Sequence, residues 1–241
     1  MYISRIKLYN WKNFRDCEVI LAERCFVIGA NATGKSNFLD VLRFLRDIVK
    51  QGGGLQFAVN VRGGLKKIRC LAARQRTEVC VEVDISENGK NDPKWKYSLE
   101  LVNTGGGIQN VTALVNREEV YNYYTKEKIL LRDNSFKDDD AETKKYTHLE
   151  QPTANAKFRE IKDVFQTTEY LNVIPQFVRD ADSIMLSSGM EDYYGRNFMR
   201  RLALLNEKTR NKYLKIINEV LLTAVPQLEN LSFVKDEKGV P

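Results

Sequence analysis

The sequence predicts an α/β fold, and three observations along its 241 residues support this prediction. A glycine-bounded loop, Gly29 to Ser36, reads Gly-Ala-Asn-Ala-Thr-Gly-Lys-Ser. Directly after it, residues 37–49 carry apolar side chains at every third and fourth position, as on one side of a helix. From Val79 to Leu131, short stretches of period-two alternation are separated by turn residues, which predicts an antiparallel meander.

The loop matches the phosphate-binding pattern G-x-x-x-x-G-K-[ST]. Gly29 and Gly34 lack a Cβ, so the backbone can take positive φ and turn its N–H groups around an anion. Lys35 is the residue expected to reach the β- and γ-phosphates, and the Ser36 hydroxyl is expected to ligate Mg²⁺. The sequence therefore predicts a nucleotide site with Lys35 as its catalytic residue, made of Gly29, Ala30, Asn31, Ala32, Thr33, Gly34, Lys35, Ser36 and Asn37.

The elements around this loop follow from apolar patterning. Two strands are expected at residues 3–9 and 17–21, joined by Asn10–Asp16. The apolar run Cys25–Ile28 predicts a strand buried on both faces, leading into the loop. A helix from Lys35 to Lys50 should stop before Gly52-Gly53-Gly54, and Gly63-Gly64 marks a further turn.

The rest of the chain divides by composition. Meander strands are expected at residues 79–85, 95–101, 108–115, 120–124 and 129–131, with a turn at Asn116–Glu118. Together with the elements before it, this meander is expected to form a nucleotide-binding lobe over residues 1–131. Residues 132–155 are polar and predict a mobile loop. Residues 156–241 predict a mainly helical subdomain, with helices at 156–165, 196–205 and 208–224. They also predict a core strand at 170–174 and a final hairpin cut at its turn, which suggests that the native sequence continues beyond Pro241.

Composition narrows the class of protein. Hydrophobic residues make up 43% and charged residues 29%, which is ordinary for a soluble protein. No apolar run reaches about 18 residues and the N-terminus lacks a signal-peptide core, so we expect a cytoplasmic protein without a membrane partner. The four cysteines lack metal-type spacing. His148 is the only histidine, which excludes histidine-based metal clusters.

The net charge is +6, and the basic residues cluster: no Asp or Glu occurs from Ile48 to Thr77. Two interpretations stay open. The stretch can be a surface that faces DNA or RNA, or its counter-charges can come from elsewhere in the fold. The nucleic-acid candidates are Arg62, Lys66, Lys67, Arg69, Arg74 and Arg76.

The Asn13-Phe14-Arg15 segment, followed by a short strand and the Gly-x-Asn-x-x-Gly-Lys-Ser-Asn loop, carries a family resemblance. It resembles the P-loop head domains of ABC-type ATPases that include SMC, RecF and OLD-family proteins. Arg62-Gly63-Gly64, the meander and the Tyr194–Asn197 helix start are similar to the bacterial branch of AAA-type predicted ATPases. Many members of that branch act in anti-phage defence.

The resemblance implies an ATP- and Mg²⁺-dependent switch, in which two heads form a homodimer around the nucleotides. It also implies action on DNA or RNA, or together with a nuclease or other effector partner. By position, Arg15 would lie near the phosphates, Asn31 would donate to them and Gln176 would help hold Mg²⁺. The alternatives are that Arg15 is a surface turn residue and Gln176 a solvated loop residue.

Two departures from the family pattern matter. Its ATPases hydrolyse ATP with a hydrophobic strand that ends in Asp-Glu, whereas Asp236-Glu237 here has turn chemistry. Leu186–Met190 resembles the ABC signature but leads to no such strand, and we interpret it as a loop. The chain is therefore expected to bind ATP·Mg²⁺ with little turnover. The alternatives, a transporter-type ABC subunit and a small-molecule kinase, fit the Asn-Phe-Arg segment and the meander less well.

Overall fold

A computed structural model describes residues 1–72, 77–90, 92–103, 112–133, 140, 142–174, 176, 178, 192–229 and 231–234. The chain forms two compact units, Met1–Glu169 and Tyr170–Pro241. This boundary lies later than the sequence predicts, because the segment that follows the meander belongs to the first unit.

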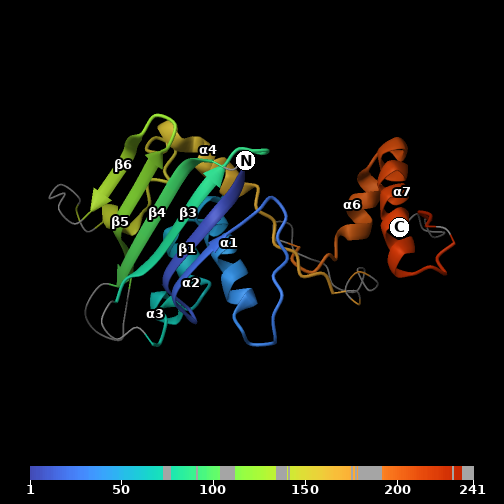
Figure 1. Ribbon diagram of the computed structural model, residues 1–241, viewed down its shortest axis with the longest axis horizontal. Helices are drawn as coiled ribbons and strands as arrows, with labels where there is room; N and C mark the ends of the chain where they lie inside the picture. Colours follow the sequence, from blue (N-terminus) through green and yellow to red (C-terminus); the bar gives the residue numbers. More distant parts are fainter. Residues whose placement is uncertain are drawn as a thin grey trace. The chain divides into compact units, whose positions relative to one another are not determined.

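A six-stranded sheet with the order β2-β1-β3-β4-β5-β6 forms the centre of the first unit (Figure 1). All neighbouring strands are antiparallel. The predicted α/β fold with an antiparallel meander is thereby confirmed. The strands are β1 (Tyr2–Trp11), β2 (Phe14–Ile20), β3 (Val79–Ser86), β4 (Pro93–Asn103), β5 (Ala113–Asn122) and β6 (Glu127–Asp133).

Two segments that the sequence predicts as connections are largely parts of strands. β1 and β2 run on to the pair Trp11 and Phe14, so the connection is a tight turn rather than the predicted Asn10–Asp16 loop. Asn116–Glu118 lies inside β5 rather than at a turn, because Arg117 pairs with β4 on one side and with β6 on the other. Hydrogen bonding on both sides overrides the turn preference of these polar residues.

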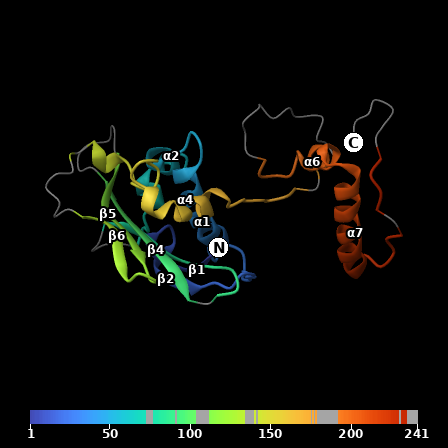
Figure 2. The ribbon, with the colours of Figure 1, turned by 90° about the horizontal axis from the view of Figure 1, so that it is seen from above.

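Helices cover one face of this sheet (Figure 2): α1 (Lys35–Val49), α2 (Leu55–Asn60) and α4 (Arg159–Gln166). The predicted first helix is confirmed within one residue. Its fully buried Val41, Phe44 and Leu45 belong to the same core cluster as Ile6 and Leu8 of β1. Each such side chain contributes about 1.5–3 kcal/mol by leaving water. The sequence pattern missed α2 and the four-residue α3 (Leu65–Ile68), which are too short to show a period.

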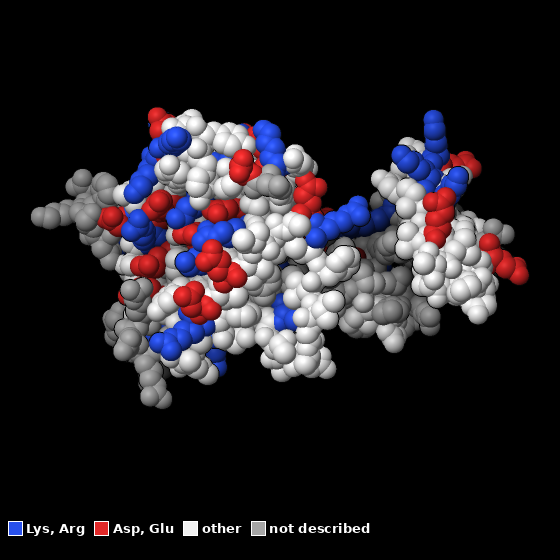
Figure 3. Space-filling model, in the orientation of Figure 1, with Lys and Arg blue, Asp and Glu red and all other residues white. Residues whose placement is uncertain are grey.

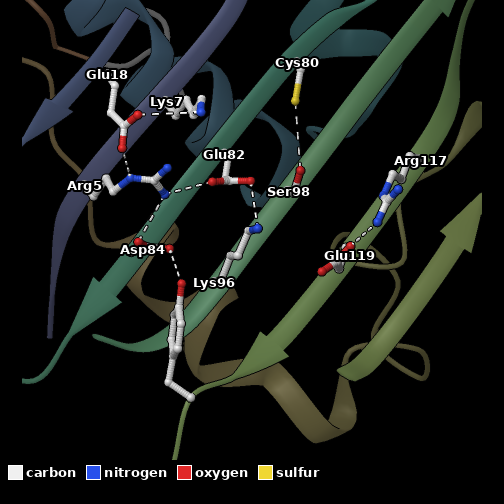
Figure 4. Close-up of polar contacts among 11 residues, drawn as sticks. Arg5, Lys7, Glu18, Cys80, Glu82, Asp84, Lys96, Ser98, Arg117 and Glu119 are labelled. Carbon is white, nitrogen blue, oxygen red and sulfur yellow. Dashed lines mark hydrogen bonds and ion pairs between the residues drawn. The ribbon is translucent and has the colours of Figure 1, made fainter. Parts of the chain in front are cut away.

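The opposite face of the sheet carries a ladder of charged pairs (Figure 4). Arg5 binds Glu18, Glu82 and Asp84 at 2.6, 2.8 and 3.2 Å, and Lys96 binds Glu82 at 2.9 Å. Although partial burial opposes it, the hydrogen bonds to Glu18 and Glu82 raise the pKa of Arg5 above its ordinary value. Because both signs alternate across the strands, this face has no net basic character.

The segment after β6 is held onto the sheet by a buried carboxylate, so the prediction of a mobile loop over residues 132–155 is wrong for its described part. Glu118 is fully buried and accepts hydrogen bonds from the backbone N–H groups of His148 and Leu149, at 2.8 and 3.2 Å. Arg132 pairs with it at 3.3 Å, and the Tyr97 hydroxyl donates to it at 3.1 Å. Two short 3₁₀ helices, η1 (Thr143–Lys145) and η2 (Ala156–Phe158), flank this anchor.

The second unit contains α6 (Phe198–Leu204) and α7 (Glu207–Ala224), which confirms the two late helices. The Asn206 side chain caps α7 by accepting a hydrogen bond from Thr209 N–H at 2.8 Å. The predicted core strand at 170–174 is wrong: Leu171 and Val173 are exposed, and the segment forms no strand. The predicted final turn and the signature-like Leu186–Met190 lie outside the described residues.

Candidate nucleotide-binding site

The phosphate loop, Gly29–Ser36, takes its arched shape from two residues with positive φ. Ala32 has φ 65° and Gly34 has φ 103°. Gly29 does not have positive φ, which corrects the conformational role predicted for it. A Cβ at Gly29 would lie 3.1 Å from the Thr33 hydroxyl oxygen, so this glycine allows the close approach of the Thr33 side chain. Of the two loop glycines, Gly34 is the one that combines left-handed backbone with a crowded α-carbon.

The Lys35 ammonium group lies against the start of the loop. Its Nζ donates to the carbonyl oxygens of Gly29 and Ala30 at 2.7 and 2.6 Å. Lys35 therefore stands at the loop, where the motif requires a cation. A long, flexible side chain can exchange these two carbonyls for phosphate oxygens without any change in the backbone.

The loop also offers a row of unused donors. Among the described residues, none accepts a hydrogen bond from the backbone N–H groups of residues 30–37. The N-terminus of α1 has no side-chain cap and no acidic residue in its first turn, so the positive end of its dipole is not neutralised locally. Free N–H groups, a helix N-terminus and a lysine are the donors that a triphosphate needs. These residues fit the predicted nucleotide.

The residues predicted to complete the site are placed as follows. Asn31, Ala32, Thr33 and Ser36 are exposed, so a ligand can reach them. The Ser36 hydroxyl belongs to the first turn of α1, where the motif places a Mg²⁺ ligand. Within the described part of the chain, no group of three His, Cys, Asp or Glu side chains forms a metal cluster.

Two further predicted residues stay without a demonstrated role. Arg15 is exposed in β2. Gln176 is exposed and belongs to the second unit, whereas the loop belongs to the first. Their assignment to the phosphates and to Mg²⁺ remains a prediction.

The predicted strand before the loop is absent. Residues 25–28 form no sheet pairing within the described chain, and Phe26 and Ile28 are 89% and 91% exposed. An apolar run identifies a segment that tends to be buried, but a strand forms only where a neighbouring strand supplies hydrogen bonds. In the described fold, β1 is paired on both sides, by β2 and β3, and neither edge strand, β2 or β6, pairs with this segment.

The turn between β1 and β2, residues 11–14 (the hairpin turn), contacts the start of α1, a feature that the sequence pattern did not reveal. The Trp11 indole N–H donates to the Asn37 carbonyl oxygen at 2.9 Å. Lys12 pairs with Asp40 at 2.6 Å. Phe14 stacks edge-on against Phe38, with ring centroids 6.5 Å apart. The Asn13-Phe14-Arg15 motif could have indicated this contact, but the prediction drawn from it concerned Arg15.

Arg62 is not part of an exposed basic surface, so its prediction as a nucleic-acid contact is wrong. Its side chain is 6% exposed and binds both oxygens of Asp40, at 2.9 and 3.0 Å, and Asp47 at 2.8 Å. Burial alone would raise the pKa of Asp40, but Arg62 and Lys12 together hold it below its ordinary value. The counter-charges of the basic stretch thus come partly from α1.

Fewer of the predicted basic residues in this stretch are shown to be exposed. Lys66 and Lys67 are exposed on α3, and Arg69 is partly buried beside Trp11, with which it forms a β-bridge. Arg74 and Arg76 lie outside the described residues. Figure 3 shows acidic and basic side chains interspersed over the sheet rather than a single basic patch.

The fold and loop together define a P-loop nucleotide-binding domain. Comparison with known families agrees: the family described as "AAA domain, putative AbiEii toxin, Type IV TA system" matches residues 25–214. The match covers most of the chain, which therefore belongs to this family of AAA-type ATPase domains. A search of curated proteins found no match.

In the described part of the chain, no helix combines the length and the apolar character that a bilayer-spanning segment requires.

Proposed function

We propose that this chain is the ATP-binding part of an ABC-type ATPase of the SMC/RecF/OLD kind. It would act as an ATP-driven dimer switch on DNA or in anti-phage defence, together with a nuclease or other effector. The observation that carries the proposal is the phosphate loop: unused N–H donors of residues 30–37 surround a lysine that is bound only to two carbonyl oxygens. The family description, which names a toxin of a TA system, supports a defence role.

The residues divide the work as follows. The backbone donors and Lys35 would bind and orient the phosphates, and the Ser36 hydroxyl would hold Mg²⁺. Bound Mg²⁺ would neutralise charge on the phosphate oxygens. Arg15, in the same unit as the loop, would lie near the phosphates, and the family resemblance assigns Gln176 to Mg²⁺. Since no strand in the described part of the chain ends in Asp-Glu, we expect it to hold the nucleotide without hydrolysing it at an appreciable rate.

Titration with a fluorescent ATP analogue in the presence of Mg²⁺ tests the binding site. Lys35→Ala should abolish binding, because it removes the cation that faces the phosphates. Lys157→Ala, which removes an exposed lysine from η2, is the matched control and should bind like the wild type. Unchanged binding by Lys35→Ala would contradict the assignment of the loop.

Steady-state phosphate release tests the expected turnover. The purified chain should release phosphate at a rate close to that of its own Lys35→Ala variant. A rate typical of an intact ATPase would overturn the proposal that this chain binds without hydrolysing.

Retention on DNA tests the nucleic-acid role. With and without ATP, binding should weaken steeply as salt rises, since phosphate contacts release counterions. Lys66→Glu combined with Lys67→Glu should reduce retention, because these two lysines are exposed on α3. Retention that is insensitive to both changes would remove DNA from the proposal.

A further inference from the structure

The side chain of Asn13 contacts the Gly34 end of the phosphate loop and the first turn of α1. Its Oδ1 accepts a hydrogen bond from Asn37 Nδ2 at 2.8 Å. Its Nδ2 lies 3.5 Å from the Thr33 carbonyl oxygen, to which it donates. A Cβ added to Gly34 would lie 2.3 Å from the same nitrogen, so the amide rests directly against the Gly34 α-carbon.

These contacts fix the orientation of one peptide group. In a trans peptide the C=O and N–H bonds point in opposite directions. Because the Thr33 carbonyl is directed at Asn13, the Gly34 N–H points away from the hairpin turn. Within the described chain no group accepts a hydrogen bond from this N–H, so it stays available to an anion. The left-handed backbone of Gly34, φ 103° and ψ 6°, is the conformation that this arrangement requires.

We propose that Asn13 is a positioning residue of the phosphate loop: its amide holds the Thr33–Gly34 peptide so that the Gly34 N–H faces the nucleotide phosphates. The inference rests on the proposed function, since it assumes that the loop binds a nucleotide. Asn13 itself acts through Gly34 and Asn37 and does not touch the ligand.

The same contacts connect the loop to the sheet. Asn37 donates a hydrogen bond from its side chain to Asn13, and its carbonyl oxygen accepts one from the Trp11 indole. Trp11 is fully buried and packs edge-on against Phe44, with ring centroids 5.1 Å apart. Binding of phosphates at the first turn of α1 therefore changes the surroundings of the Trp11 indole. Of the two tryptophans in the chain, Trp95 lies elsewhere, on β4, where it donates to Glu160.

The experiment compares Asn13→Ala with Lys12→Ala in titrations with a fluorescent ATP analogue and in thermal unfolding. Asn13 is exposed, so its truncation should leave the melting temperature nearly unchanged. The affinity for the analogue should fall about tenfold, the effect of one lost or misdirected hydrogen bond. Lys12→Ala removes the neighbouring contact with Asp40 and should lower the melting temperature without changing the affinity.

A spectroscopic readout separates positioning from general loosening. In a Trp95→Phe background, ATP should change the fluorescence of Trp11, and Asn13→Ala should reduce this change. Equal affinity of Asn13→Ala and wild type, or an equal loss in Lys12→Ala, would overturn the role of Asn13 while leaving the nucleotide site intact. Failure of the wild type itself to bind the analogue would instead remove the proposed function.

Discussion

Replacement of Arg62 by alanine should destabilise the first unit by an amount that the structure bounds. The guanidinium binds Asp40 and Asp47, whose side chains are 10% and 5% exposed, and also the Ala58 carbonyl oxygen. Removal of one partner from a buried ion pair costs about 3–5 kcal/mol, because it leaves an uncompensated charge. Here Lys12 still pairs with Asp40, and Lys50 still pairs with Asp47 at 3.0 Å.

Since each carboxylate keeps one partner, we expect a loss of about 2–3 kcal/mol in the free energy of unfolding, below the full range for a buried pair. For a unit of this size the loss corresponds to a fall of roughly 5–10 °C in melting temperature. Urea unfolding followed by circular dichroism measures the free energy, and a thermal scan measures the shift. The control is Lys66→Ala, an exposed basic residue nearby, which should change stability by less than about 0.5 kcal/mol.

The pH dependence gives an independent check. The pKa of Asp40 is lower in the folded than in the unfolded protein, so its ion pairs stabilise the fold above its ordinary pKa and lose that effect as pH falls through the lowered value. Wild type should therefore lose more stability than Arg62→Ala between pH 7 and pH 3. Equal stability of the two proteins at pH 7 would refute the account of Arg62 as a buried bridge.

Two further substitutions test the loop and the buried anchor. Gly34→Ala should weaken binding of the ATP analogue more than tenfold, because the new Cβ meets Asn13 and φ 103° is unfavourable for alanine; binding at wild-type strength would show that the loop has another conformation. Glu118→Gln should lower the free energy of unfolding by about 2–4 kcal/mol, since it removes the charge facing Arg132 and sets an amide N–H₂ against existing donors. A change below about 0.5 kcal/mol in urea unfolding would exclude this anchor.

Local signals predicted the parts of the fold that depend on local chemistry. The helix after the loop was located within one residue, because its apolar period and the glycines at both ends are encoded in adjacent positions. The alternation at residues 79–85 and 95–101 likewise located β3 and β4. Lys35 and Ser36 follow from a motif whose spacing is itself the geometry of the site.

The wrong predictions concern residues whose contacts come from distant parts of the sequence. Residues 25–28 are apolar, yet nothing in their own sequence supplies a neighbouring strand. Glu118 appears as a turn residue until the backbone of residues 148–149 is brought to it from a distance. Arg62 appears as surface charge because its carboxylate partners are on a helix that precedes it by 15 and 22 residues. Such contacts become visible only in the folded chain.

The order of strands has a consequence for how the protein folds. β3 to β6 pair with their nearest neighbours in sequence, so this four-stranded part of the sheet can form early from contacts that need little loop closure. β1 must instead join β3 through pairs such as Leu8 with Val81, which closes the chain around the phosphate loop and its helix. We therefore expect the nucleotide-binding region to acquire its native shape in the last step of folding. Its amides should be the first in the sheet unit to exchange with deuterium.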